Sequence, residues 1–246
     1  MSEYFGVSVS NGLIGAVSSK SPLRLSQTVL AGTYDKMGRG RVDNIAETFS
    51  ALNLGISFNG QGLSYYNYVQ ELNMKEGSMG HSMSSGTFSL SYKYYTLKNL
   101  PHIFYTEVSV GVLEDGELVV NNIQEAPSYL NEISKNYEDI DTRNKVYSVI
   151  STTALTKSGK IQLAIASSFL LDNDNGVRLL HENWDTNLHL LKLKKSLKKG
   201  DSFKFAIATC LISSSHADDT ENEAIRLVIR ASSMTDILSN HVRKWN

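Results

Sequence analysis

The side chains best suited to acid, base or metal chemistry are scattered along this sequence and form no catalytic pattern. Neither a phosphate-binding glycine loop nor a nucleophile elbow is found. The six histidines lack the spacing that would place two metal ligands on one helix face; they are His81, His102, His181, His189, His216 and His241. A lone histidine is more often packed or solvated than a ligand. We therefore predict no catalytic residue, no metal site and no cofactor in this chain.

Two further features could carry chemistry, and both favour a structural interpretation. The acidic run LDNDNG at 171–176 resembles a calcium loop, but its glycine comes one position early and no glutamate occupies the bidentate position. Asn, Asp and Gly favour turns for backbone reasons alone, so a turn is expected there. Cys210 lies in the apolar run FKFAIATCLI, where a buried, unreactive thiol is expected.

The charge balance points to no nucleic-acid or membrane partner. Lys and Arg number 24 against 25 Asp and Glu, which leaves a net charge of -1. The lysine-rich stretch 189–205 is best interpreted as a solvated hairpin tip around Lys198 and Lys199. The first residues lack the basic start and apolar core of a signal peptide, and no apolar run is long enough to span a membrane. A single cysteine suits the cytoplasm without excluding the periplasm, so the compartment stays open.

The elements that would have to position any site are mostly strands. In the run at 203–212, Phe203, Phe205, Ile207 and Leu211 fall on one side, as in a strand with one face against a core. The runs at 144–155 and 160–169 predict a hairpin across Ser158-Gly159, and glycine turns are also expected at Asn59-Gly60 and Asp115-Gly116. At least nine short strands with few helical stretches between them predict a large antiparallel β-sandwich.

Only the C-terminal stretch has a helical pattern. Thr220 and Glu223 suggest a capping box, after which Ala224, Leu227, Val228 and Ala231 share one face. A second helix is expected from Thr235 and carries Trp245 on an apolar stripe with nothing left to bury it. We therefore divide the chain into a β-sandwich domain at 1–218 and a helical linker at 219–246, and expect the native polypeptide to continue.

Six tyrosines are concentrated in two stretches of the sequence and allow two interpretations. Exposed tyrosines on a sheet can stack on sugar rings, since an aromatic surface matches the apolar face of a sugar. They can equally form cross-strand pairs that stabilise the sheet. The second is favoured because β-propensity alone enriches tyrosine in strands. The residues concerned are Tyr65, Tyr66, Tyr68, Tyr92, Tyr94 and Tyr95.

Five segments in order resemble the N-terminal β-sandwich domain of glycoside hydrolase family 65, the family of maltose, kojibiose and trehalose phosphorylases and related hydrolases. They are SNGLIG (10–15), LAGTYD (30–35), ALNLGISFNGQGLSYY (51–66), YVQELNMKEGSMGHSM (68–83) and YYTLKNLPHIFYTEVSV (94–110). Asn73 departs from the family's usual aspartate. In the most distinctive segment, 68–83, we expect two strands joined at Gly77, with Leu72, Met74 and Met79 pointing into the sandwich.

The resemblance implies a supersandwich of the galactose-mutarotase type with a structural role. In the family the catalytic acid and the phosphate or water site belong to a downstream (α/α)6 barrel, which would act on α-glucosides with inversion. The sandwich would pack on that barrel and shape its entrance. The loops nearest the entrance make Asn11, Tyr34 and Asp35 the expected substrate-side contacts. An oligosaccharide ligand and a homodimer are further expectations from the resemblance.

Two other functions remain open at this stage. The chain would be a free-standing carbohydrate-binding sandwich if the tyrosine-rich surface around Tyr92 and Tyr94 were exposed. A mutarotase-type sugar epimerase would need a histidine and a carboxylate that converge in a cleft. Neither His81 nor His102 has a sequence context that demands this.

Overall fold

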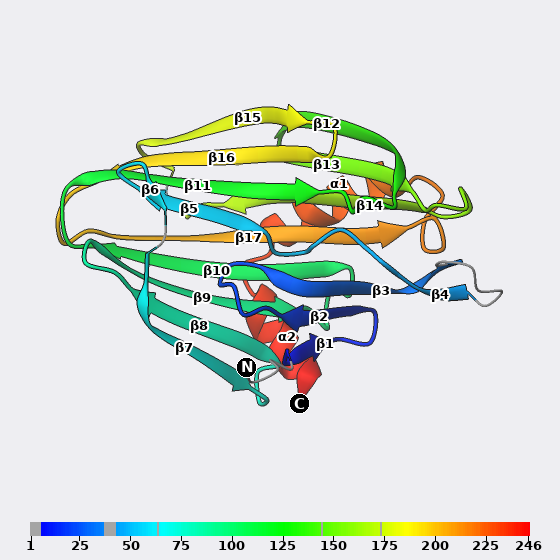
Figure 1. Ribbon diagram of the computed structural model, residues 1–246, viewed down its shortest axis with the longest axis horizontal. Coiled ribbons are helices and arrows are strands. Elements are labelled where there is room, and N and C mark those ends of the chain that lie inside the picture. The colour runs from blue at the N-terminus through cyan, green and yellow to red at the C-terminus, as the bar shows by residue number, and fades with distance from the viewer. Residues whose placement is uncertain (1–5, 37–42, 63, 144, 173) are drawn as a thin grey trace.

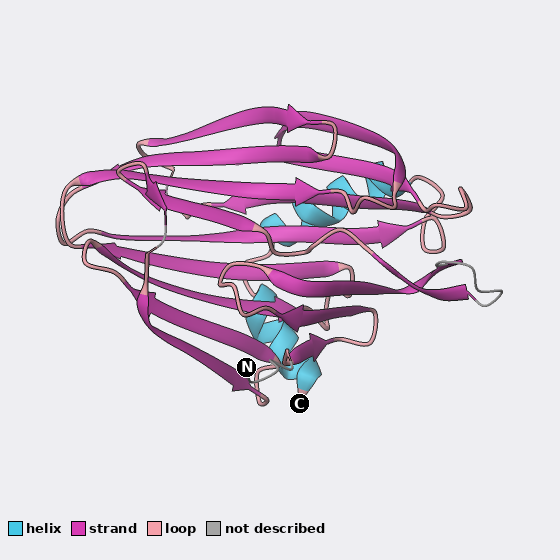
Figure 2. Ribbon diagram, in the orientation of Figure 1, coloured by secondary structure: helices cyan, strands magenta, loops and turns pink. Residues whose placement is uncertain are grey.

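Antiparallel sheets and two C-terminal helices build the chain in layers (Figure 1). The computed structural model describes residues 6–36, 43–62, 64–143, 145–172 and 174–246. An eight-stranded sheet forms the central layer, with a five-stranded and a four-stranded sheet in front of it and both helices behind it (Figure 2). The predicted large antiparallel sandwich with a short helical C-terminus is confirmed.

The strands of each sheet follow one another in space as hydrogen-bonded neighbours. The four-stranded sheet runs β1 (Ser8–Ser10), β2 (Ile14–Ser18), β3 (Leu25–Lys36), β4 (Asp43–Glu47). The eight-stranded sheet runs β12 (Asn131–Asp141), β13 (Val146–Leu155), β14 (Gln162–Leu170), β17 (Ser202–Ser213), β10 (Ile103–Val112), β9 (Phe88–Thr96), β8 (Ser78–Ser84), β7 (Tyr66–Asn73). The five-stranded sheet runs β15 (Val177–Asp185), β16 (Leu188–Leu197), β11 (Gly116–Glu125), β5 (Leu54–Phe58), β6 (Gln61–Gly62).

The main hydrophobic core lies between the eight-stranded sheet and the two sheets in front of it. Alternation along each strand sends bulky side chains inward, as predicted for Phe203, Phe205, Ile207 and Leu211 of β17. In β9 the same rule buries Phe88, Leu90, Tyr92 and Tyr94. Inner faces of two sheets thus meet as in a β-sandwich.

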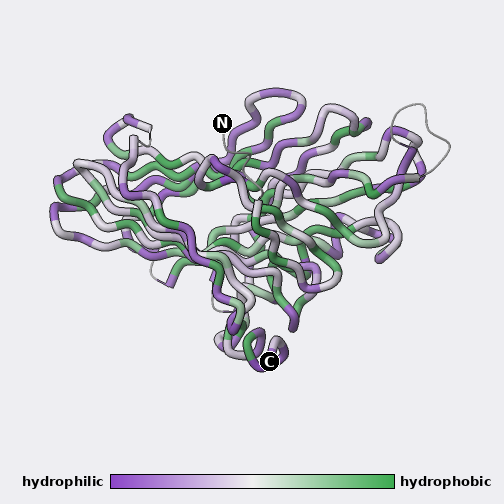
Figure 3. Tube along the Cα trace, turned by 60° about the horizontal axis from the view of Figure 1, so that its bottom comes forward, coloured by the Kyte–Doolittle hydropathy of each residue, from purple (hydrophilic) through white to green (hydrophobic). Residues whose placement is uncertain are grey.

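The opposite face of the eight-stranded sheet is also buried where the helices cover it. Small side chains on β14 and β17 leave room there for α1 (Thr220–Ser232), whose buried face includes Leu227 and Val228. The small residues are Ala164, Ala166, Ala206, Ala208 and Cys210. Burial raises the pKa of the Cys210 thiol, in agreement with the expected unreactive cysteine. In Figure 3 the helical turns at the C-terminus lie at the bottom, outside the sheets.

Two of the three predicted glycine turns are confirmed. Asn59 and Gly60 both have positive φ, at 51° and 74°, as the predicted tight hairpin between β5 and β6 requires. Gly159 has φ 72° in the predicted hairpin of β13 and β14. The expected positive-φ turn at Asp115-Gly116 is wrong: Gly116 begins β11, and the bend before it crosses from the eight-stranded to the five-stranded sheet.

The segment 68–83 forms the predicted strand pair, β7 and β8, joined at a turn that ends with Gly77 at φ 59°. Met79 is buried as expected. Leu72 and Met74 are not: they are 42% and 77% exposed. The reason is that β7 is the last strand of its sheet, so its inward-facing positions extend past the sheets in front.

The two helices begin differently from the sequence prediction. Asp219, rather than Thr220, caps α1 by accepting a hydrogen bond from the backbone N–H of Asn222. The second helix, α2, spans Ile237–Trp245 after Asp236. Trp245 is half-buried rather than left without a partner, because its indole lies against Gly77 and its Nε1 donates to the carbonyl oxygen of Met74 at 2.8 Å.

A continuous chain of buried polar side chains joins the two large sheets. Gln124 of β11 donates to Ser167 of β14 at 3.0 Å and accepts from Thr152 of β13 at 2.7 Å. Thr152 also contacts His189 of β16 at 3.1 Å, and Asn122 donates to Ser167 at 2.9 Å. We call these five residues the polar network; it gives each of them a hydrogen-bond partner inside the core.

No helix in the described ranges has both the length and the apolar character needed to cross a lipid bilayer.

Replacing Gly77 with alanine should destabilise the chain more than the same change at Gly60. Both glycines have positive φ, which costs alanine about 1 kcal/mol. A Cβ at Gly77 would also lie 2.5 Å from the Trp245 ring, whereas nothing lies within 4 Å at Gly60. Urea unfolding should therefore give a loss of about 1 kcal/mol for Gly60→Ala and about 2–3 kcal/mol for Gly77→Ala. Equal losses would show that Trp245 does not rest on this turn.

Candidate functional site

Three loops and the end of strand β3 converge beside the helices, at the end of the sandwich where β9 and β17 finish. Asn11 holds the first of them in place. Its Nδ2 donates to the carbonyl oxygens of Leu97 and Pro101, both at 2.8 Å, and its Oδ1 accepts from the N–H groups of Leu13 and Ile14. Every polar atom of the Asn11 side chain is thus used within the protein. Asn11 positions its loop, and it has little left to offer a ligand directly.

Asp35 has a similar structural role. Its carboxylate is buried and accepts hydrogen bonds from the N–H groups of Lys36 at 2.7 Å and Ser158 at 3.0 Å. Burial alone would raise the pKa of Asp35, but the hydrogen bonds from Ser158 and Lys36 outweigh it and lower that pKa. The charged carboxylate therefore ties β3 to the turn between β13 and β14.

Tyr34 is the one residue of the predicted three that presents its side chain to solvent. It is 50% exposed and pairs across the strands with Ile45 of β4, which is also exposed. A phenol with a free face offers both an apolar surface and a hydroxyl. The structure thus separates the three residues into one that faces outward and two that hold loops.

His102 and His216, which no sequence pattern connects, meet at the same loops. The rings of His102 and His216 lie edge to face with centroids 4.9 Å apart. His216 bonds to Ser213 Oγ through Nδ1 and lies against Gly32, at which an added Cβ would come within 3.3 Å of the ring. Burial lowers the pKa of both histidines, so both are neutral near pH 7. No sequence signal reveals the pair, since 113 positions separate them.

We call this region the loop end; it comprises residues 10–12, 32–35, 97–102 and 213–216. Each part contacts the next: Asn11 bonds to Pro101, His102 packs on His216, and Ser215 Oγ donates to the carbonyl oxygen of Gly32 at 3.1 Å. Its exposed aromatic groups are the Tyr34 phenol and the neutral His216 imidazole. Such groups suit hydrogen bonding and stacking with a hydroxyl-rich ligand.

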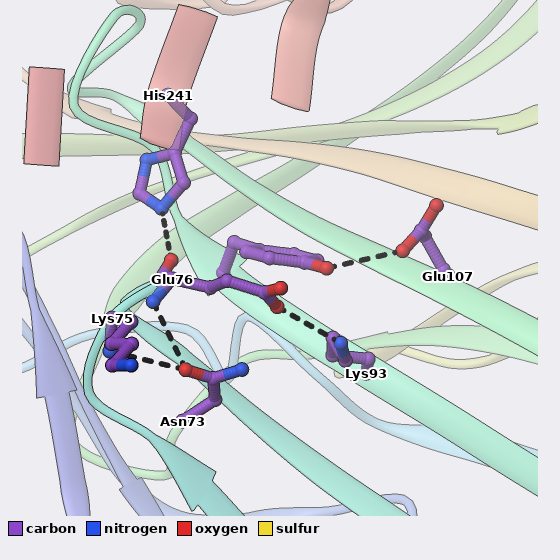
Figure 4. A network of polar contacts seen from close by, with 7 residues as sticks. Asn73, Lys75, Glu76, Lys93, Glu107 and His241 are labelled. Atoms are coloured by element: carbon purple, nitrogen blue, oxygen red, sulfur yellow. Dashed lines mark hydrogen bonds and ion pairs between the residues drawn. The ribbon is translucent and has the colours of Figure 1, made fainter. Parts of the chain in front are cut away.

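The loop end is fastened to α2 through His241, which is fully buried (Figure 4). Its Nδ1 accepts from the N–H of Lys98 at 3.0 Å, and its Nε2 donates to the carbonyl oxygen of Glu76 at 2.9 Å. An N–H can only donate and a carbonyl can only accept, so the ring must be neutral with its proton on Nε2. Asn99 adds a hydrogen bond to the carbonyl oxygen of Ile237 at 3.0 Å.

The tyrosine-rich surface proposed for a carbohydrate-binding module does not exist at Tyr92 and Tyr94. They are only 3% and 1% exposed and stack on His81 inside the core. His81 is itself buried, and desolvation lowers its pKa to about 4. Its ring stacks on Tyr68 and Tyr92 and bonds to the Tyr68 hydroxyl at 2.8 Å, so it is not presented to a sugar as an epimerase histidine would have to be. The preferred interpretation of the tyrosines, as residues that stabilise the sheet, fits these contacts.

No metal centre is present among the described residues, since no three histidine, cysteine or acidic side chains lie together in a suitable way. Glu47, Glu125 and Asp185 border a hollow of about 550 Å³ between β4, the β11–β12 connection and the end of β15. They do not form a ligand set.

Comparison with known proteins gives a consistent assignment. The model of the family described as glycosyl hydrolase family 65, N-terminal domain, matches residues 4–246. A kojibiose hydrolase of Flavobacterium johnsoniae is 35% identical over 99% of this chain, which spans 37% of that protein's length. A solved structure from the human microbiome, described as a candidate kojibiose phosphorylase, has a TM-score of 0.69 over 97% of this chain and 35% of its own, at 12% identity. A galactose mutarotase related enzyme of Lactobacillus acidophilus gives a lower TM-score of 0.45 at 9% identity, over 84% of this chain and 97% of its own.

Replacing Asp35 with asparagine should destabilise the chain by about 1–3 kcal/mol, because the buried side chain would then turn an amide NH2, which cannot accept, toward one of its two N–H partners. Asp218 is exposed, and the matched change Asp218→Asn should alter stability by less than about 0.5 kcal/mol. Chemical unfolding at pH 7 measures both. If Asp35→Asn lowered the free energy of unfolding no more than Asp218→Asn, the inference that Asp35 ties β3 to the β13–β14 turn would be wrong.

Acid should weaken the attachment of α2 to the loop end. Burial and the nearby Lys98 lower the pKa of His241 below its ordinary 6.5, although the bond to Glu76 opposes this. The unfolded chain therefore binds the proton first, so the stability that His241 contributes is complete above pH 6.5 and is lost as pH falls below it. His81 and His189, whose pKa values desolvation lowers to about 4, act in the same direction.

The variant His241→Gln should reduce the steepness of this acid destabilisation, measured as melting temperature against pH. Asn240→Gln, on the same helix, is the control, because it removes no titratable group. A profile unchanged in His241→Gln would contradict the assignment of a neutral, doubly bonded ring.

Proposed function

The chain belongs to glycosyl hydrolase family 65 as an N-terminal domain of that family, and we propose that it is the non-catalytic β-sandwich of an enzyme that cleaves α-glucosides. In this proposal it packs on a downstream catalytic (α/α)6 barrel and forms one wall of the barrel's entrance. The relatives' names suggest kojibiose, a glucose disaccharide, as the substrate, cleaved by water or by phosphate.

The lengths of the relatives support a larger protein. The chain covers 37% of the kojibiose hydrolase that it resembles and 35% of the solved phosphorylase structure. A catalytic domain fits in the remainder. Residues 219–246, which contain α1 and α2, would then be the linker between the sandwich and that domain.

The observation that carries the proposal is the exposed edge strand β7. Large apolar side chains project from β7 and the turn after it; they are Tyr66, Val69, Leu72 and Met74, at 42–77% exposure. Exposed apolar edge strands promote aggregation unless something covers them. The opposite edge of the same sheet, β12, carries exposed Asn131, Glu132 and Asp139 instead, as protected edges do.

The position of α2 makes the downstream domain the best candidate to cover β7. Trp245, the last residue of α2, bonds to Met74 at the end of that edge. A polypeptide that continues after residue 246 leaves the sandwich beside these apolar side chains. The following domain thus needs only a short connection to reach them.

The loop end would be the part of the sandwich that reaches the substrate. Tyr34 and His216 supply its exposed polar groups, whereas Asn11 and Asp35 hold the loops that carry them. The reacting acid would come from the barrel, where it protonates the leaving oxygen while water or phosphate attacks from the other face.

The first experiment is an activity assay on this chain alone. Residues 1–246 are incubated with kojibiose, with and without inorganic phosphate, and glucose release is measured. We expect no release above the buffer rate. Turnover that survives careful purification would overturn the non-catalytic assignment.

A second experiment tests the covered edge. In the longer polypeptide, Leu72→Asp should lower the melting temperature and the soluble yield, because a carboxylate would be buried against the barrel. In residues 1–246 alone the same change should cost less than about 0.5 kcal/mol, since Leu72 is already exposed. Leu113→Asp, at an exposed leucine near the other end of the sandwich, is the control and should affect neither. Equal behaviour of both variants in the longer polypeptide would exclude β7 as the contact.

A further inference from the structure

The face of the eight-stranded sheet that carries the helices is covered only in part. In Figure 2 the helices lie behind the centre and right of the sheets, and the left part of the large sheet carries none. A groove of about 470 Å³ occupies the uncovered part, over β7, β8, β9, β10 and β17. Its volume is in the range of small-molecule sites.

Strand register explains the shape of this groove. Two neighbouring rows of paired residues cross the sheet on this face. One row is Glu71, Gly80, Lys93, Glu107 and Ala206, and the other is Val69, Ser82, Ser91, Ser109 and Lys204. Glycine, alanine and serine make a low floor, and longer charged side chains rise around it.

The charged groups are held in place before any ligand arrives. Tyr95 donates its hydroxyl to Glu107 Oε2 at 3.2 Å, which leaves the other carboxylate oxygen for a partner (Figure 4). Lys93 pairs with Glu76 at 3.0 Å and has two further N–H donors. Fixed donors and acceptors lower the entropy that a ligand would lose on binding.

The chemistry of the lining selects a class of ligand. Carboxylates and ammonium groups lie side by side, so neither an anion nor a cation is favoured. Among the lining side chains only Val69 is both large and apolar and well exposed, which disfavours a lipid or an amphipathic helix. Serine hydroxyls, a carboxylate and an ammonium group together match the alternating donors and acceptors of a sugar.

We propose that this groove binds a neutral saccharide; its identity as one or two glucose units rests on the substrate proposed above. The site lies on the face of the sheet opposite the main core, and it involves neither the loop end nor the exposed side chains Leu72 and Met74. It is therefore distinct from the entrance role proposed above, and it shares only Val69 with the exposed apolar edge of β7. Such a site would retain a glucoside near the enzyme without taking part in its cleavage.

The test is a titration of isotope-labelled residues 1–246 with D-glucose and with kojibiose, followed by amide NMR shifts. We expect saturable millimolar binding with shifts at Gly80, Ser91 and Ser109. Lys93→Ala and Glu107→Ala should each weaken binding by about tenfold, the effect of losing one hydrogen bond to a charged group.

The controls are Lys194→Ala and Glu117→Ala. They remove one partner each from a comparable ion pair, 3.7 Å long, on the outer face of the five-stranded sheet. They should leave the affinity unchanged, and melting curves of all four variants verify that each is folded. Absence of binding by either sugar, shifts located away from the groove, or equal affinity in all four variants would each overturn the proposal. The proposal would also be overturned if the groove bound no sugar and if, in the longer polypeptide, the downstream domain protected the amide hydrogens of the groove from exchange with solvent.

Discussion

The architecture depends on one strand pair that must pack on both of its faces. Strands β14 and β17 place bulky residues such as Phe169 and Phe205 toward the front sheets, while Ala166 and Ala208 face the helices. A large residue in place of either alanine would lift α1 from the sheet, because interiors are packed at crystal-like density. This division between large and small side chains sets where α1 packs on the sheet. The position of α1 in turn sets the direction of α2 and the arrangement of the loop end that α2 contacts.

Much of the fold could be predicted because its signals are local. Alternation of apolar and polar residues predicted strands such as β9 and β17, and the hairpin glycines predicted turns between strands. The helical spacing of apolar residues predicted the buried face of α1. The misjudged features depend on which elements lie next to one another. The bend at Gly116 crosses between sheets, and Leu72 is exposed because its strand is the last in the sheet. Trp245 finds its support 168 residues away, at Gly77.

The same distinction applies to the candidate site. Resemblance to known loops identified Asn11, Tyr34 and Asp35, but the sequence could not tell a loop-holding side chain from one that faces solvent. The hydrogen bonds that Asn11 and Asp35 make to distant backbone groups required coordinates to detect. The pairing of His102 with His216 had no local signal at all, since it arises where two strand ends meet. Tyr92 shows the reverse case, in which β-propensity correctly predicted a stabilising role.

The polar network has a consequence for how the sheets find their alignment. Hydrophobic side chains tolerate several sliding arrangements of two sheets, since leucine packs almost as well against one neighbour as another. Hydrogen bonds among Gln124, Ser167, Thr152, Asn122 and His189 do not, because a shift of one residue would turn them away from each other. Each buried group left without a partner costs about 1–3 kcal/mol. The network thus acts as a lock that penalises misaligned sandwiches and leaves a single registration of the two sheets.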